Sequence, residues 1–382
     1  MTESNQHPLS PEKLAAELAD QAVSAQEVAP SGEPDAVSPA VAPEVPSAAV
    51  QSVDHGVQVP LASGGLSAPI TTTPRLASKA DVLDDIAGHA PAVIELPPGK
   101  HLLDVADLRV AYPQKGMFAK PVEILHGVSI AVEEGRTMGL VGESGCGKTT
   151  LGRAVLGLAP ITGGTVTFDG KDIAHAGRGE RRKLSRDIQV VFQDPYTSLN
   201  PSMTIGDILS EPLGIQGISG ADARKRVRDL VDRVKLPSDS MDRLPREFSG
   251  GQRQRVAIAR ALALQPRLIV CDEPVSALDL STQARVLDLF LEIQQTLGVS
   301  YLFVSHDLDV IRHVSHRVAV MFKGEIVEQG LAEKVTEHPE HPYTQRLLLA
   351  SPVPDPDKQA QRRTERRAHT AAMAAAAAAA AA

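Results

Sequence analysis

The sequence predicts an α/β fold in which a mostly parallel sheet carries helices and a helix-rich insertion lies beside it. Short apolar runs typical of central parallel strands occur at 137–141, 267–271 and 300–304. Helical patterns at 149–158 and 282–297 follow the first two of these runs. Strands that alternate with helices in this way predict parallel strands joined by helical crossovers.

Other segments alternate apolar and polar residues and contain glycine turns, as β-strands do. They occur at 102–112, 124–135 and 165–173, and the pattern at 317–330 predicts a closing hairpin. From Thr204 to about Leu264 the pattern is mainly helical and rich in Arg and Asp. We therefore expect a helical subdomain over about 194–265, inserted at the side of the sheet.

The net negative charge and the prolines are concentrated in the first part of the 382-residue chain. Residues 1–100 contain 13 acidic and 4 basic side chains and 13 of the 28 prolines. Proline at that density interrupts helices and strands, so we expect a disordered Ala/Pro-rich extension with one short helical stretch around 11–25. The tail over 356–382 is also expected to be disordered, which leaves one ordered domain over 101–350.

The remaining composition excludes several classes of protein. Residues 101–382 contain 34 acidic and 35 basic side chains, which is not the basic field of a nucleic-acid binder, so no nucleic-acid partner is expected. The two cysteines form neither a disulfide framework nor a metal-ligand spacing, which indicates a reducing cytosol. The N-terminus does not resemble a signal peptide, and no run of about 18–20 strongly apolar residues occurs. We expect any membrane association to come through partners.

A loop of the form G-x-x-x-x-G-K-[ST] lies at 142–149, between an apolar strand and a helix. Its glycines let consecutive backbone N–H groups turn inward and form an anion nest at a helix N-terminus. Lys148 is expected to reach the β- and γ-phosphates, and the Thr149 hydroxyl to ligate Mg²⁺. The loop therefore predicts ATP and Mg²⁺ as ligands. The residues expected to bind nucleotide here are Gly142, Glu143, Ser144, Gly145, Cys146, Gly147, Lys148, Thr149 and Thr150.

Two carboxylates follow the apolar strand that begins at Leu268. Asp272 is expected at the carboxyl end of this strand, where it can hold the Mg²⁺ shell. Glu273, one residue later, can polarise a water aligned on the γ-phosphate. Without a phosphate loop in the chain, such a pair would be an ordinary surface charge.

Three further residues are expected at the same site. Gln193 follows the strand at 188–192, and its amide can reach Mg²⁺ or the attacking water. His306 follows the strand at 300–304 and is expected to contact the γ-phosphate and the base. Tyr112 is expected to stack on adenine, although an ordinary strand aromatic is the alternative.

A second glycine-containing segment, Ser249-Gly250-Gly251-Gln252, opens the helix predicted over 253–264. Ser249 can cap this helix, and the glycines leave its N–H groups uncovered, so that the terminus attracts a γ-phosphate. The phosphates of the same subunit already have their own nest. We therefore expect this segment to bind the ATP of another copy, so that two subunits close around each nucleotide.

In this order, the motifs resemble those of the ATP-binding-cassette (ABC) ATPases. The matching set comprises 142–149, Gln193, 248–252, 268–273, Ser276-Ala277-Leu278-Asp279 and His306, with Phe248 in place of the commoner Leu. The resemblance covers about 101–350. It implies a P-loop NTPase core with a RecA-like, mostly parallel sheet, an antiparallel β subdomain and an inserted helical subdomain that carries 248–252, the signature. It also implies head-to-tail dimers with two ATP molecules at the interface.

A narrower likeness is to the peptide-permease branch, which imports oligopeptides and dipeptides. The segment His341-Pro342-Tyr343-Thr344-Gln345 is its most specific feature, because it lies outside the ATP chemistry. The likeness implies a C-terminal segment over about 331–355 and an ATPase motor that drives import. The implied partners are a second ATPase subunit, identical or not, two transmembrane permease subunits and an extracytoplasmic solute-binding protein. The chain would then lie at the cytoplasmic face of the cell (inner) membrane.

Two alternatives to peptide import stay open. Nickel, glutathione and sugar-conjugate importers share these motifs, and the motor subunit does not touch the cargo. A soluble cassette protein for translation or DNA repair is the more distant alternative. Such proteins usually carry two cassettes or a long coiled-coil insertion. This chain has one phosphate loop and one signature, at 142–149 and 248–252, with no room between them for a long insertion.

Overall fold

Two β-sheets organise the described part of this computed structural model, which comprises residues 100–114 and 120–350. The predicted disorder and helical stretch before residue 100, and the predicted disordered tail, lie outside the described residues. The larger sheet has six strands in the order β10-β9-β3-β8-β7-β6. The smaller has four strands in the order β2-β1-β4-β5.

The larger sheet is parallel except at one edge. Its strands are β3 (Thr137–Val141), β6 (Ile188–Val191), β7 (Leu268–Asp272), β8 (Ser300–Ser305), β9 (Arg317–Phe322) and β10 (Glu325–Leu331). β10 pairs antiparallel with β9, which confirms the predicted hairpin. β6, β7, β8 and β3 are consecutive parallel neighbours, so their carboxyl ends lie along one edge of the sheet.

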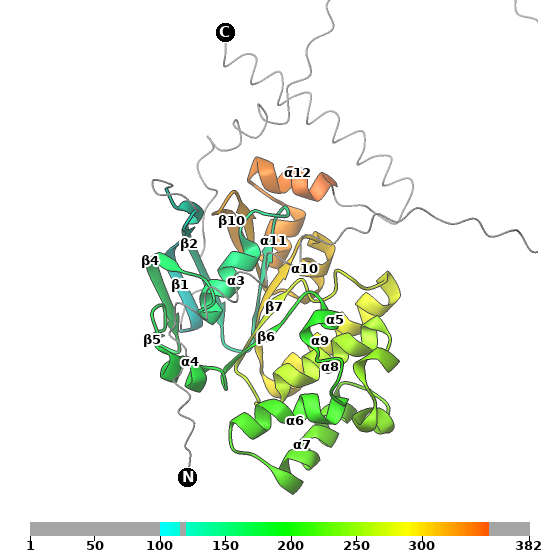
Figure 1. Cartoon of the computed structure of the whole chain (residues 1–382). Coiled ribbons are helices and arrows are strands. Elements are labelled where there is room, and N and C mark those ends of the chain that lie inside the picture. Colours follow the sequence, from blue (N-terminus) through cyan, green and yellow to red (C-terminus); the bar gives the residue numbers. More distant parts are fainter. Residues whose placement is uncertain (1–99, 115–119, 351–382) are drawn as a thin grey trace, which may run out of the picture. The chain divides into compact units, whose positions relative to one another are not determined.

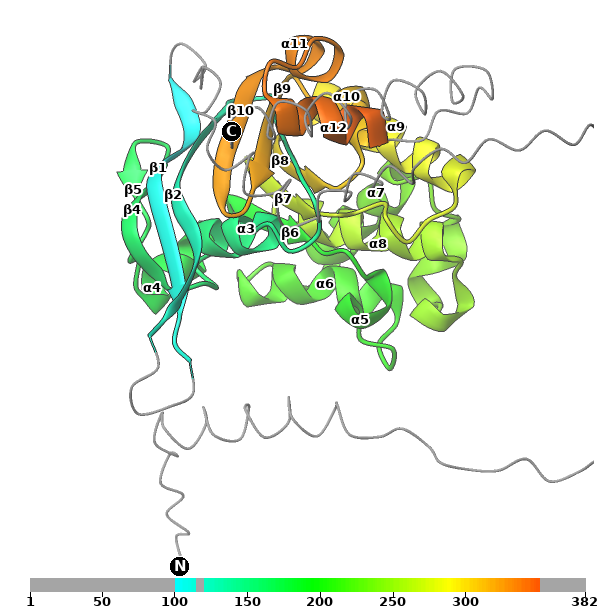
Figure 2. The ribbon, with the colours of Figure 1, turned by 90° about the horizontal axis from the view of Figure 1, so that it is seen from above.

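The smaller sheet is antiparallel throughout. Its strands are β1 (His101–Tyr112), β2 (Val122–Glu133), β4 (Ile161–Phe168) and β5 (Lys171–Asp172). The three segments predicted as strands from alternating polarity all lie here, which confirms those predictions. In both Figures 1 and 2 this sheet lies on one side of the larger sheet, and α6 to α8 lie on the other.

The helices connect the strands and form the insertion. They are α3 (Lys148–Leu156), α4 (Arg178–Leu184), α5 (Pro195–Ser198), α6 (Ile205–Ile215), α7 (Gly220–Arg233), α8 (Gly250–Leu262), α9 (Leu280–Leu297), α10 (Leu308–Val314), α11 (Ala332–Glu337) and α12 (Pro342–Ala350). Two 3₁₀ turns, at 238–242 and 245–247, interrupt the helical pattern between α7 and α8. Pro237 and Pro245 begin these turns, since proline favours the start of a helical turn and cannot continue a preceding helix. α3 ends two residues earlier than predicted, because Gly157 adopts φ 73° and caps it.

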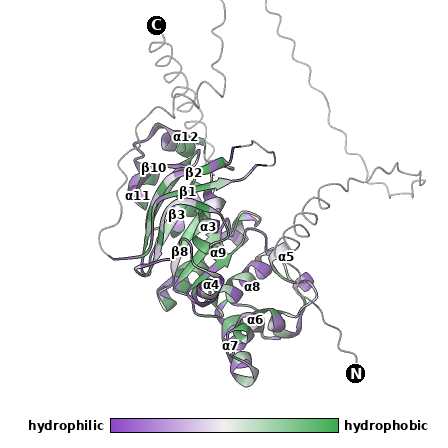
Figure 3. Ribbon diagram, turned by 60° about the vertical axis from the view of Figure 1, so that its left-hand side comes forward, coloured by the Kyte–Doolittle hydropathy of each residue, from purple (hydrophilic) through white to green (hydrophobic). Residues whose placement is uncertain are grey.

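Alternate residues of the parallel strands pack into two different cores. On β8, Tyr301 and Phe303 belong to the core formed with α8 and α9, whereas Leu302 and Val304 belong to the core formed with α3 and the antiparallel sheet. The ribbon of α7 shows both apolar and polar colours in Figure 3, as expected of a helix with one buried face. Among the described residues, none of the helices has the length and apolarity needed to cross a membrane.

Candidate functional site

The phosphate loop connects β3 to α3 and leaves the N-terminus of α3 uncovered. Gly147, the N-cap residue, has φ 113°, and no side chain caps the helix. A Cβ at Gly147 would lie 2.8 Å from Leu125 Cδ2, so glycine is required by both conformation and space. The N–H groups of the first helical turn are therefore available to an anion.

The Lys148 side chain folds back onto the first residues of the phosphate loop. Its side chain is 5% exposed, and its ammonium donates to Gly142 O at 2.7 Å and to Glu143 O at 2.9 Å. Two carbonyl oxygens thus compensate the buried charge. Cys146 Sγ lies 4.0 Å from Lys148 Nζ, and burial raises the pKa of the Cys146 thiol.

The loop and the end of β7 meet through one hydrogen bond. Thr149 Oγ1 donates to Asp272 Oδ1 at 3.0 Å. Burial raises the pKa of the Asp272 carboxyl, and the hydrogen bond from Thr149 opposes that rise. Both groups present oxygen atoms, the ligand type that Mg²⁺ prefers.

Glu273 joins the ends of three neighbouring strands. Its carboxylate Oε2 accepts a hydrogen bond from Gln193 Nε2, beyond β6, at 3.3 Å. His306 Nδ1, directly after β8, lies 3.1 Å from the same oxygen. The backbone of Glu273 has φ 47° and its N–H donates to Val304 O, which turns the chain at the end of β7. The structure thus brings together the three residues predicted to be catalytic, Glu273, Gln193 and His306.

A cavity of about 490 Å³ lies over the loop and this carboxylate. Tyr112, the last residue of β1, lines this cavity with Gln193 and Glu273. The phosphate-loop residues that line it are Ser144, Gly145, Gly147, Lys148, Thr149 and Thr150. Ile124 and Arg153 also line the cavity and were missed from the sequence. Arg153 lies four residues after Thr149, one helical turn further along α3, and that spacing was available as a signal.

The signature residues do not line this cavity. Ser249 Oγ accepts from Gln252 N at 3.4 Å, and Gln252 Oε1 accepts from Ser249 N at 2.9 Å, which forms a capping box. Ser249 is exposed, while Gly251 is buried against α9. A Cβ at Gly251 would lie 2.2 Å from Thr282 Cγ2, so only glycine fits there. The exposed Ser249 therefore lies at a helix start that is packed against α9 through Gly251.

Comparisons with known proteins agree with this geometry. The family model described as ABC transporter matches residues 125–276, and that described as oligopeptide/dipeptide transporter, C-terminal region, matches 327–377. The oligopeptide transport ATP-binding protein OppF of Salmonella typhimurium is 47% identical over 282 residues, 72% of this chain and 84% of the relative. The chain belongs to the ABC transporter ATPase family.

Other matches extend the comparison. The oligopeptide transport ATP-binding protein OppD of Mycobacterium tuberculosis is 50% identical over 238 residues, 62% of this chain but only 39% of that longer relative. Among solved structures, the dimeric ATP-binding cassette MJ0796 with ADP and Pi has a TM-score of 0.55 and 29% identity, and the match covers 60% of this chain and 98% of that one. The predicted ABC-type α/β fold, the family and the ATPase activity are thereby confirmed.

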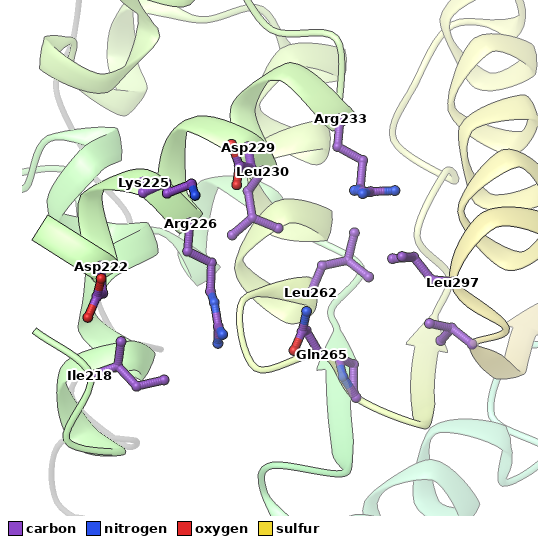
Figure 4. Close-up of a pocket in the computed structure, with 12 residues that line it drawn as sticks. Ile218, Asp222, Lys225, Arg226, Asp229, Leu230, Arg233, Leu262, Gln265 and Leu297 are labelled. Atoms are coloured by element: carbon purple, nitrogen blue, oxygen red, sulfur yellow. The ribbon is translucent and has the colours of Figure 1, made fainter.

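This ABC ATPase has a second, larger cavity of about 810 Å³ between α7, the end of α8 and the end of α9. Figure 4 shows Arg226, Arg233 and Gln265 around it, with Leu262 and Leu297. It contains neither the phosphate loop nor any other residue predicted to act on ATP. Phosphate-loop residues, Gln193 and Glu273 instead line the cavity of about 490 Å³.

Proposed function

We propose that this ABC ATPase is the motor subunit of a membrane importer for oligopeptides or dipeptides. The observation that carries the cargo class is the match of residues 327–377 to the oligopeptide/dipeptide transporter C-terminal region, because that region lies outside the ATP chemistry. The names of the relatives that are 46–50% identical support the same class. The motor lies at the cytoplasmic face of the membrane and is held there by its partner subunits.

Nucleotide binding uses the cavity over the phosphate loop. The uncovered N–H groups at the start of α3 and the Lys148 ammonium bind the phosphates, and Tyr112 stacks on the adenine. The residues present fit Mg²⁺, since Thr149 Oγ1 and Asp272 Oδ1 lie 3.0 Å apart and the Gln193 amide oxygen is the third candidate ligand. When bound, Mg²⁺ supplies positive charge that offsets the charge of the β- and γ-phosphates.

Hydrolysis is assigned to the cluster around Glu273. The Gln193 amide and the His306 ring hold its Oε2 and so orient the carboxylate toward the cavity. Glu273 accepts a proton from the attacking water, while His306, half exposed, is placed to contact the γ-phosphate. This assignment is supported by the convergence of three strand ends on one carboxylate oxygen.

The second subunit completes the site. Ser249 is exposed, and the signature residues do not line their own chain's cavity, which supports a role in contacting the γ-phosphate held by a partner ATPase, identical or different. A shift of such a dimer from 1:99 to 99:1 closed needs about 5.5 kcal/mol of differential binding. Charge-assisted contacts to two γ-phosphates are of that order.

The loop after Gln193, including residues 195–200, is the candidate contact for a cytoplasmic helix of one of the two transmembrane permease subunits. Tyr196 is exposed in this loop, and Phe192, which directly precedes Gln193, is exposed as well. The guanidinium of Arg253 lies 4.0 Å from the centre of the Tyr196 ring, and Arg260 donates to Ser198 O at 2.8 Å, so α5 is fastened to the signature helix α8. A permease helix gripped by α5 is thereby linked to the helix that meets the partner's ATP.

The test is isolation of the full chain from membranes, followed by reconstitution of the recovered complex in lipid vesicles. We expect two permease subunits, a second ATPase and an extracytoplasmic solute-binding protein to be recovered, and ATP to drive uptake of a labelled oligopeptide. Uptake of nickel or glutathione but not of peptide would reassign the cargo. A stable complex without membrane subunits would favour a soluble cassette protein.

A further inference from the structure

We propose that Tyr343 in α12 is a positioning residue for nucleotide binding, which fixes the phosphate loop through the backbone of Glu143. Tyr343 Oη accepts a hydrogen bond from Glu143 N at 3.0 Å. The tyrosine lies 200 residues from Glu143 in sequence and is 1% exposed. Because it contacts the loop and not the cavity, it acts through the loop's conformation.

One peptide unit of the loop is held at both of its edges. Gly142 O and Glu143 N belong to the same planar, trans unit, so they point in opposite directions. Lys148 Nζ donates to Gly142 O at 2.7 Å, while Tyr343 Oη accepts from Glu143 N at 3.0 Å. Together the two bonds fix the orientation of this peptide plane, and with it the position of the Lys148 ammonium.

The Tyr343 side chain is itself fixed by the C-terminal segment. Its ring packs against Phe322 at the end of β9, with ring centroids 4.4 Å apart. Its backbone N–H donates to His341 Nδ1 at 3.2 Å. The hydroxyl therefore has little freedom to follow the loop if the loop moves.

The approach to α12 is held by a buried carboxylate. Glu328, on β10, is 4% exposed and accepts from Glu340 N at 2.8 Å and from His341 N at 3.1 Å. A carboxylate that accepts two backbone N–H groups makes charge-assisted bonds, which are stronger than neutral ones. β10, α12 and the phosphate loop thus form one continuous hydrogen-bonded chain.

The inference rests on ATP binding at this loop, which belongs to the proposed function, and not on the identity of the cargo. Loss of the Tyr343 hydroxyl leaves the Glu143 N–H without this acceptor and frees the peptide plane to rotate. The ground-state affinity for ATP then falls, whereas saturating ATP restores the loop. The expected signature is a raised KM with nearly unchanged kcat.

The experiment compares Tyr343→Phe with Tyr301→Phe in the full chain. Tyr301 is the matched control, since it is also buried and its hydroxyl donates to Phe290 O at 3.2 Å, outside the site. We expect the Kd and KM for Mg-ATP to rise on the order of tenfold in Tyr343→Phe, the effect of one hydrogen bond, with kcat within about twofold of wild type. Thermal unfolding without nucleotide should change by similar amounts in both variants.

Equal ATP affinity in Tyr343→Phe and the control would overturn the proposal and reduce Tyr343 to a packing residue. If Tyr343→Phe does not fold, Glu328→Gln becomes the deciding variant, because it loosens the segment that carries Tyr343. A raised Kd in that variant supports the proposal, and an unchanged one refutes it. If the wild-type protein itself did not bind ATP, that result would contradict the proposed function and not only the role of Tyr343.

Discussion

The phosphate loop and the signature segment are both glycine-rich starts of helices, yet their surroundings differ. The loop residues 142–150 bond to groups from elsewhere in the chain, among them Asp272 and Tyr343. The polar groups of Ser249 and Gln252 bond to each other. The phosphate loop is therefore fixed by contacts with distant parts of the chain, whereas the signature segment is fixed by local contacts and leaves Ser249 exposed.

This difference shows how one chain can carry two halves of different sites. In the proposed mechanism, the first half binds a nucleotide and contains the groups that activate water. The second half has no such groups near it and is preformed by its own capping box and by the packing of Gly251 on Thr282. A preformed surface binds a partner's phosphate at a low entropic cost.

Replacement of the proposed base, Glu273, should give the largest effect on ATP hydrolysis. It tests whether the phosphate-loop region performs the hydrolysis step. Glu273→Gln keeps the shape that contacts Gln193 and His306 but cannot accept a proton. We expect phosphate release to fall by about 10²- to 10⁴-fold while ATP still binds. Size-exclusion chromatography with ATP should then show an accumulated closed dimer.

The matched control for that change is Glu325→Gln, since Glu325 is an exposed carboxylate on β10. It should hydrolyse ATP at the wild-type rate. If Glu273→Gln also hydrolysed ATP at the wild-type rate, Glu273 would not be the base. The phosphate-loop region would then not differ from the signature segment by containing the catalytic base.

Ser249→Ala tests the second half and should have the next largest effect. In the proposed mechanism the serine contacts ATP only in the closed dimer, so we expect turnover to fall by about 10- to 100-fold, the range of one charge-assisted hydrogen bond. The Kd for ATP of the monomer should stay within about twofold. Gly251→Ala is a poorer test, because its Cβ would collide with Thr282 and disturb the helix itself.

Thr204→Ala controls for the loss of a helix cap. Thr204 Oγ1 accepts from Asp207 N at 3.2 Å at the start of α6, away from both regions. It should lower stability about as much as Ser249→Ala and leave turnover unchanged. Equal turnover in Ser249→Ala and Thr204→Ala would show that the signature segment does not contribute to the ATP site. Full activity at protein concentrations where only monomers exist would show the same.

The smallest effect is expected outside both regions, at Asp169. Its pKa is lowered from 3.8 to about 2, first by the hydrogen bond from Arg267 and then by Lys100. Because the folded-state pKa lies below the ordinary value, the stabilisation is present above about pH 4 and is lost as the pH falls toward 2. Asp169→Asn should therefore lower the urea midpoint slightly at pH 7, with unchanged ATPase activity.

The pH series provides the check on that interpretation. The difference in urea midpoint between wild type and Asp169→Asn should narrow between pH 4 and pH 2. A constant difference over that range would assign the effect to packing and not to charge.

Local patterns predicted the elements and the type of each candidate residue, because a strand that ends in a polar residue is visible in sequence. They did not predict which strand ends would meet. Gln193 and His306 reach one oxygen of Glu273 because β6, β7 and β8 are neighbours, and that order is a property of the whole sheet. The contact of Tyr343 with the loop has no local signal at all, since it joins residues at opposite ends of the domain.

The helical insertion shows a different limit. The pattern from Thr204 to about Leu264 predicted a mainly helical segment, and Pro237 and Pro245 divide it with two short 3₁₀ turns. The two prolines can be read from the sequence. The conformation of the turns that they begin also depends on how these turns pack against the neighbouring helices. Met241 O, for example, would lie 2.9 Å from a Cβ at Gly206 of α6, so the first turn approaches that helix closely.

The two cores that share the parallel sheet restrict where this chain can change length. Along β7, Ile269 and Cys271 face one core, and Leu268 and Val270 face the other. A single inserted residue would exchange these faces for the rest of the strand and turn Asp272 away from Thr149. Natural insertions and deletions in relatives should therefore fall in the connections between strands.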